Sequence, residues 1–268
     1  MDGHTNPLAF NSGFAPEPLK GHPKSVRLEG RDFQGTGSLN LQQVYFLPSG
    51  KIAEISTYQP DGSIGRRTVY EYSDDGLTTT ENSFDRTGRL VSASRAVRKG
   101  NEIEQTVTGA EGKIATTTIT RLDECGLPVE AVLTNHDDSS KWRMMQHYDA
   151  EGRSLGGEVV FEGMPPGFPT RIVIPARQDL ALTTAYASDG TVLFNNELQR
   201  EKMPGDLVSE FSRTQFAGGS VERSTVERID SIDTEGNWTK KTIFAGTAPD
   251  QQGKPVAEVY RTITYYDG

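Results

Sequence analysis

The amino-acid sequence predicts an all-β protein: a long antiparallel β-meander of repeated hairpins that forms a curved or coiled sheet. The first observation is a regular spacing of glycines, which recur in steps of 12 or 14 residues. The second is that turn-forming residues precede most of these glycines. A 12-residue step holds one strand of about eight residues and one turn of about four. The glycines are Gly50, Gly62, Gly76, Gly88, Gly100, Gly112 and Gly126.

The turns themselves have the composition of type I turns closed by a left-handed glycine. Gln59-Pro60-Asp61-Gly62 places proline second and glycine fourth, and Asp85-Arg86-Thr87-Gly88 places aspartate first. Such turns connect neighbouring antiparallel strands. The polar cluster at 135–140 interrupts the spacing without a glycine and is predicted to turn as well. Later turns are more widely spaced, so we expect the C-terminal strands to be longer or to carry bulges.

The segments between the turns have strand composition. Ile114–Thr120 and Thr262–Tyr266 are rich in β-branched and aromatic residues. No segment has a 3.6-residue apolar period over three turns, which predicts few or no helices. Leu77–Phe84 and Ile114–Arg121 are polar on both faces, so the sheet is expected to be wetted on both sides, with its more apolar stretches facing inward. A β-propeller is the alternative, because four strands of this length make a blade.

Two regions are expected along the chain. Residues 1–38 are rich in proline and glycine and contain no periodic run, which predicts a loose N-terminal arm or linker. Residues 39–268 carry the glycine spacing and are expected to form the repeated hairpin domain.

Composition limits the classes of function. Apolar residues make up 34% of the chain, and 37 acidic against 28 basic residues give a formal net charge of −9. This charge argues against nucleic-acid binding. No run approaches 18 apolar residues, so no helical membrane span is expected. The single cysteine, Cys125, excludes an internal disulfide. No signal peptide is visible, and a chain that begins after a cleavage site would look the same.

Several turns share a longer motif, in which an aromatic or aliphatic residue is followed by Asp, two variable residues, Gly and then Arg or Asn. Phe84–Leu90 and Tyr148–Arg153 match it well, and Ile232–Trp238 and Leu122–Leu127 are looser copies. The motif resembles the YD repeat of the RHS-repeat family. The resemblance implies consecutive hairpins that coil into a shell, which encloses or displays other polypeptides, in proteins that are mostly secreted or at the cell surface. A short, stand-alone relative of that family fits the chain best.

No catalytic, cofactor-binding or metal-binding residue is predicted. His136 and His147 flank an expected strand, which places them about 30 Å or more apart at 3.3 Å per residue. Asp74, Asp75 and Asp85 lie in turns, where aspartate forms hydrogen bonds with the backbone. Nucleotide-binding, zinc-protease and nucleophile-elbow motifs are absent.

Candidate partner contacts are aromatic or lie in one irregular segment. Gly163–Pro169 is a proline-rich loop with Met and Phe on an otherwise polar meander, although a plain connection also explains it. Trp142 and Trp238 are suited to stack on a sugar ring or a peptide, or to cover neighbouring hairpins. The candidates are Met164, Pro165, Pro166, Phe168, Trp142 and Trp238.

The last strand is expected to need a neighbour. Val256–Tyr266 is rich in β-branched and aromatic residues, has no proline, and carries only Glu258 and Arg261 as charges. An exposed edge of this kind favours aggregation. We expect the N-terminal arm to cover it or the sheet to close on it; pairing with a partner's strand is the alternative.

Together these observations predict a non-catalytic scaffold or binding protein, acting outside the cytoplasm of a bacterium (periplasmic or secreted), with a protein or glycan partner. The alternative is a hydrolase acting on glycan or lipid, with carboxylates contributed by adjacent strands. A cavity lined by carboxylates of raised pKa would favour the hydrolase, and a wet polar sheet would favour the scaffold.

Overall fold

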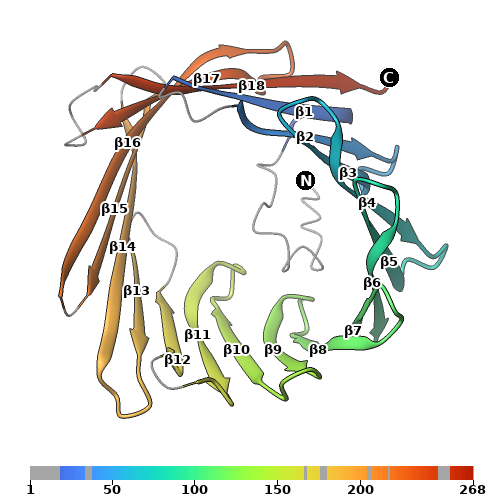
Figure 1. Ribbon diagram of the computed structural model, residues 1–268, viewed down its shortest axis with the longest axis vertical. Helices are drawn as coiled ribbons and strands as arrows, with labels where there is room; N and C mark the ends of the chain where they lie inside the picture. Colours follow the sequence, from blue (N-terminus) through green and yellow to red (C-terminus); the bar gives the residue numbers. More distant parts are fainter. Residues whose placement is uncertain are drawn as a thin grey trace.

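The computed structural model describes residues 19–33, 38–165, 168–175, 180–203, 207–216, 218–246 and 254–267. These residues form an all-β meander of 18 antiparallel strands in one sheet (Figure 1). The prediction of a long antiparallel meander is confirmed, whereas a β-propeller would have divided the strands among separate blades. The described residues contain no helix, and so none that is long and apolar enough to cross a membrane.

The strands are short in the first part of the meander and longer near its end, as the turn spacing predicted. The first nine are β1 (Pro23–Asp32), β2 (Ser38–Phe46), β3 (Ile52–Tyr58), β4 (Ile64–Tyr72), β5 (Thr78–Asp85), β6 (Leu90–Lys99), β7 (Glu102–Gly109), β8 (Ile114–Leu122) and β9 (Pro128–Asn135). The remaining nine are β10 (Lys141–Tyr148), β11 (Ser154–Glu162), β12 (Arg171–Pro175), β13 (Leu180–Tyr186), β14 (Val192–Met203), β15 (Leu207–Phe216), β16 (Gly219–Ile232), β17 (Trp238–Gly246) and β18 (Pro255–Tyr265).

The meander returns on itself. Each strand pairs with the next one in the chain, and β1 pairs with β18 as well as with β2, so the strands form a ring (Figure 1). The β1–β18 ladder runs from Pro23 opposite Tyr265 to Asp32 opposite Ala257. Both edges of β18 are therefore paired with strands of the same chain, as expected. Its backbone is not free to pair with a partner's strand.

One expectation about the N-terminal region is wrong. Residues 23–32 were assigned to a loose arm, but they form β1, an integral strand of the sheet. Pro23 stands at the first position of the strand, where a missing N–H costs little, and Gly30 lies at a register shift opposite β2. The expected arm therefore shrinks to the residues before β1, of which 1–18 lie outside the described residues.

The turns have the expected geometry. Gly62 has a φ of 83°, and its N–H donates to the carbonyl oxygen of Gln59 at 2.9 Å. The same bond and a positive φ recur at Gly50, Gly76, Gly88, Gly112, Gly126, Gly152, Gly190 and Gly236. The predicted turn without glycine is also present, and there Ser139 takes the left-handed conformation, with a φ of 61°.

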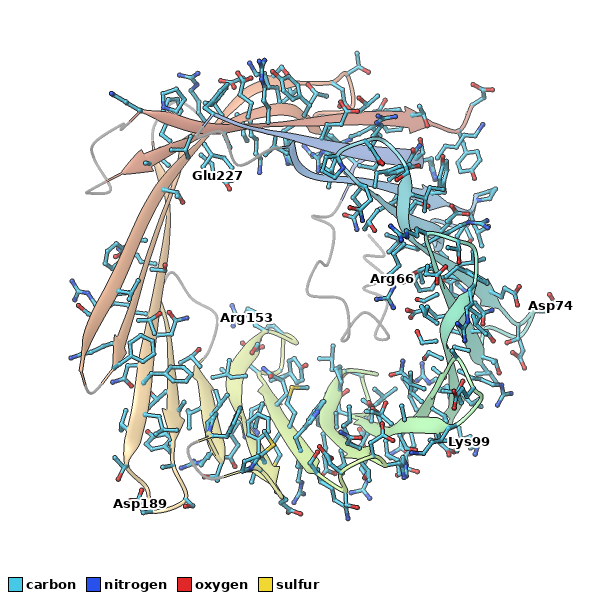
Figure 2. All side chains as sticks on the ribbon, viewed as in Figure 1. Arg66, Asp74, Lys99, Arg153, Asp189 and Glu227 are labelled. Atoms are coloured by element: carbon cyan, nitrogen blue, oxygen red, sulfur yellow. The ribbon has the colours of Figure 1, made fainter. Side chains whose placement is uncertain are left out.

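The register assigns side chains to an inner and an outer face, because directly paired residues of antiparallel strands share a face. Arg66 and Glu227 point into the ring (Figure 2). When directly paired residues are followed from Arg66 strand by strand through β5–β9, Ala131 also lies on the inner face. Onward from Ala131, paired positions form what we call the inner stripe: Ala131, Met144, Val159, Ile172, Ala185, Phe194 and Phe216. The more apolar residues thus face inward.

A small apolar cluster and a polar clasp lie near the closure of the ring. Val26, Val44 and Phe46 are buried together, with Leu19 packed against them. Nearby, the buried side-chain amide of Asn237 donates to the carbonyl oxygen of Lys20 at 3.1 Å and to the Tyr265 hydroxyl at 2.8 Å. The chain on either side of the closure is therefore fixed by both apolar contact and satisfied buried hydrogen bonds.

Candidate functional site

A hollow of about 460 Å³ lies between β9 and β10, at the end of this hairpin opposite its turn. The ladder between the two strands stops at Glu130 opposite Met145, although β10 continues to Tyr148. Side chains of both sheet faces line the hollow, at the point where the paired ladder ends. Its lining is Asp123, Val129, Glu130, Arg143, Met145, Gln146, His147, Tyr148 and Asp149.

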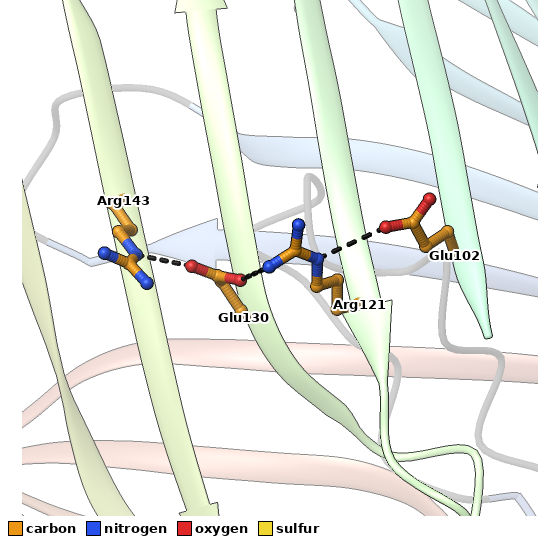
Figure 3. A network of polar contacts seen from close by, with 4 residues as sticks. All are labelled: Glu102, Arg121, Glu130 and Arg143. Atoms are coloured by element: carbon orange, nitrogen blue, oxygen red, sulfur yellow. Dashed lines mark hydrogen bonds and ion pairs between the residues drawn. The ribbon is translucent and has the colours of Figure 1, made fainter.

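The outer rim of the hollow is an ion-pair network (Figure 3). The carboxylate of Glu130, whose side chain is 14% exposed, accepts from Arg143 and, at 2.9 Å, from Arg121. Arg121 also donates to Glu102 at 3.2 Å, and this contact is the main cause that raises the pKa of Arg121. The guanidinium groups of Arg121 and Arg143 are more than half exposed, and ion pairs of exposed side chains add little to stability. The network therefore fixes side-chain positions across β7–β10 more than it stabilises the fold.

The inner side of the hollow is closed by a tyrosine. The hydroxyl of Tyr148, the last residue of β10, donates to the carbonyl oxygen of Pro128, the first residue of β9, at 3.1 Å. Burial raises the pKa of Tyr148, with a further contribution from the charge of Asp123. This hydroxyl spans the gap that the shortened ladder leaves open.

The two aspartates that line the hollow accept hydrogen bonds from the backbone of their own turns. Asp123 accepts the N–H groups of Cys125 and Leu127, and Asp149 accepts those of Glu151 and Arg153. These bonds, led by the one from Arg153, lower the pKa of Asp149. The Asp of the YD-like motif is thus a turn residue, as predicted. The described residues contain no group of three His, Cys, Asp or Glu side chains placed to hold a metal ion.

The aspartates and histidines considered from the sequence lie where strand and turn geometry placed them. Asp75 accepts the N–H of Leu77, and Asp85 accepts that of Thr87, which confirms their role in turns. His136 lies in the turn before β10, with its Nε2 2.8 Å from the Thr117 hydroxyl, while His147 lies near the other end of that strand.

The candidate partner contacts divide into two places. Trp142 on β10 pairs with Phe161 on β11, and the loop carrying Met164, Pro165 and Phe168 leaves the end of β11, so these residues share one end of the sheet. Pro166 lies outside the described residues. Trp238 is elsewhere, at the start of β17. The Arg261 guanidinium lies 3.8 Å and the Lys241 ammonium 4.4 Å from its ring centroid.

A second cluster, which the sequence did not indicate, lies on the inner face of β4 and β5. Burial raises the pKa of the Glu81 carboxyl, and it raises the pKa values of Tyr70 and Tyr72 to about 12. Glu81 is thus a partly buried carboxyl group whose pKa lies above the ordinary value of 4.5. A pair of such carboxyls, as glycoside hydrolysis uses, is not assembled around it in this part of the chain.

No protein-family model and no curated protein matches the chain. Among solved structures, a porin-like protein from Bacteroides uniformis aligns with 10% identity and a TM-score of 0.39, covering 92% of this chain and 99% of that one. The TcdB2-TccC3-TEV crystal structure aligns with 11% identity and a TM-score of 0.31, covering 76% of this chain. This chain spans 14% of that one. Because these TM-scores lie below 0.5, the resemblance to the YD-repeat family rests on the turn motifs.

Proposed function

We propose that the chain is a non-catalytic scaffold whose inner face binds an uncharged, apolar segment of polypeptide, outside the cytoplasm of a bacterium. The observation that carries this proposal is the inner stripe. It crosses seven strands, β9–β15, with aliphatic and aromatic side chains at directly paired positions. A second row beside it pairs Leu133, Trp142 and Phe161.

Charge is segregated between the two faces of this region. The outer face of β9–β12 carries Glu130, Arg143, Glu158 and Arg171, which form ion pairs along the sheet. The next residue along each strand lies on the inner face and is apolar: Ala131, Met144, Val159 and Ile172. Placing a charge against an apolar face without a partner is costly, so this surface favours uncharged ligands. An extended polypeptide matches it better than a glycan, because a polypeptide can present apolar side chains to this face, whereas a glycan presents hydroxyl groups that would lose their hydrogen bonds to water. The location outside the cytoplasm is supported by the YD-like turns.

The proposal is tested with the fluorescence of Trp142. A Trp238→Phe variant leaves Trp142 as the single tryptophan. Titration with a capped peptide of alternating valine and threonine should shift its emission to the blue. Met144→Asp should weaken this binding by about tenfold or more, because it places a charge in the stripe. Met145→Asp is the matched control, since Met145 lies on the outer face, and it should change the affinity by less than about threefold.

Three results would contradict the proposal. One is the absence of a shift with the peptide. Another is an equal loss in the two aspartate variants. The third is a shift with maltohexaose but not with the peptide, which would make the chain a glycan binder. Fractionation of cells that produce the protein tests the location separately.

A further inference from the structure

Two hairpins of the ring carry the same three residue types at the same spacing, although the hairpins lie far apart in the sequence. Glu54, Arg67 and Tyr72 in β3/β4 have the same spacing as Glu130, Arg143 and Tyr148 in β9/β10. Tyr72 and Tyr148 are 76 positions apart, and so are the members of the other two pairs. The backbone follows the same register, because Glu54 pairs with Val69 where Glu130 pairs with Met145.

In each hairpin the ladder ends before the strands do. We call the unpaired end opposite the turn the mouth of the hairpin. The neighbouring ladders continue past it: β8 pairs with β9 as far as Leu122 opposite Pro128, and β10 pairs with β11 as far as Tyr148 opposite Ser154. The seam within the β9/β10 hairpin is therefore shorter than the seams on either side.

Each mouth is clamped from both faces of the sheet. On the outer face Arg67 contacts Glu54 at 2.7 Å, and Arg143 contacts Glu130 in the same way. On the inner face the Tyr72 hydroxyl donates to the carbonyl oxygen of Ile52 at 2.9 Å, as that of Tyr148 does to Pro128 at 3.1 Å. The tyrosine in each case ends the second strand and binds the first residue of the first strand.

The two mouths differ in how firmly they are covered. At β3/β4 the Lys51 ammonium lies 4.6 Å from the centroid of the Tyr72 ring, which packs the tyrosine in place. At β9/β10 the hollow opens beside Tyr148, and residues of both faces line it. The hollow therefore lies at the point where the ladder of the β9/β10 seam ends.

We propose that the β9/β10 mouth is a latch at which the ring of strands opens laterally, with Tyr148 as the positioning residue that holds it shut. Release of the Tyr148 hydroxyl frees the end of the ladder at Glu130 and Met145, and the five paired positions of this seam then separate from the mouth toward the turn. The β3/β4 mouth has the same two contacts, and the packing of Lys51 on Tyr72 keeps it closed. This proposal does not depend on the function proposed above.

Hydrogen exchange of the full chain, followed by mass spectrometry, tests the latch. Tyr148→Phe should speed exchange of amides in 129–134 and 141–146 by about fivefold to tenfold, because a hydrogen bond of ordinary strength is lost at the opening point. Tyr72→Phe should give a smaller change, confined to β3/β4. Tyr45→Phe, at an exposed tyrosine of the outer face, should change neither seam.

An engineered disulfide across the seam gives an independent test. Ala131 and Met144 are directly paired across the seam on the inner face. In a Cys125→Ser background, Ala131→Cys with Met144→Cys should form a cross-link that restores slow exchange to the Tyr148→Phe variant. The proposal is overturned if Tyr148→Phe leaves exchange at the seam unchanged, or speeds it equally in all strands. It is also overturned if Tyr72→Phe has an equal effect on its own seam, or if the cross-link leaves exchange fast.

Discussion

The hairpins β3/β4 and β9/β10 carry the same clamp residues but differ in their turns and in the strand that follows each of them. Both keep the Glu–Arg pair outside and the tyrosine inside, but they turn differently: Gly62 takes the left-handed position in the first hairpin and Ser139 in the second. They also differ in the strand that follows, where Glu81 faces Tyr70 in one place and Gly157 faces Gln146 at the equivalent position of the other. The comparison shows that the register is set by the clamps and turns, while the inner face is free to vary.

The largest effect is expected at Gly157. A Cβ built at this residue would lie 2.1 Å from the carbonyl oxygen of Met145, an approach that backbone atoms cannot relieve without moving β10. Gly157→Ala should lower the free energy of unfolding by about 3 kcal/mol. The matched control is Glu81→Ala, at the equivalent position of the other hairpin, which should change it by less than about 1 kcal/mol. Urea denaturation measures both, and similar losses would show that the close approach is not specific to β9/β10.

The sequence predicted the parts of this fold that depend on local chemistry. Turns such as Gln59–Gly62, and the strand at Ile114–Thr120, follow from the conformational needs of glycine, proline and β-branched residues. The β1 strand was missed, because its pairing with β18 joins residues more than two hundred positions apart and proline and glycine obscure its pattern.

The candidate site was predicted only in part, for a related reason. Tyr148 belongs to a motif visible in the sequence, but its partner is a backbone carbonyl at Pro128, and only the register reveals that contact. The equal spacing of Glu54, Arg67 and Tyr72 and of Glu130, Arg143 and Tyr148 is a signal in the sequence that could have found both clamps.

The difference between the two hairpin turns predicts a gain in stability. A non-glycine residue in the left-handed conformation carries strain that glycine avoids. Ser139→Gly should therefore raise the free energy of unfolding by about 0.5–1 kcal/mol. The reciprocal change, Gly62→Ser, should lower it by about 1 kcal/mol. Thermal unfolding of the two variants measures the pair, and a loss in Ser139→Gly would mean that the serine side chain stabilises the turn.

The inner face of β5, the strand that follows the first hairpin, predicts a pH-dependent effect at Glu81. Because burial raises its pKa in the fold above the ordinary value of 4.5, ionisation at neutral pH opposes folding. The contribution of Glu81 to stability is therefore greatest below pH 4.5 and falls as pH rises through the raised pKa. Glu81→Gln should raise the melting temperature at pH 7 relative to the parent, and this gain should shrink toward pH 4. A gain that is constant with pH would show that packing, and not charge, is the cause.

The turns that follow the two hairpins predict the opposite pH dependence. Asp75 and Asp149 have pKa values below the ordinary 3.8, chiefly because the Ser73 hydroxyl donates to Asp75 and the Arg153 N–H donates to Asp149. Their ionised forms stabilise the folded state, so this contribution is complete above about pH 4 and is lost as pH falls through the lowered pKa values.

Asp149→Asn should lower the melting temperature slightly at pH 7 and flatten its decline below pH 4. Asp75→Asn should do the same in the turn after β4. Asp75 is exposed and Asp149 is partly exposed at the surface, so the changes should be the smallest of this set. A variant that keeps the full acid-induced loss would show that its aspartate does not contribute to it. Since exposed carboxylates recur in the other turns, the parent protein should lose stability gradually over this range, with no single steep step.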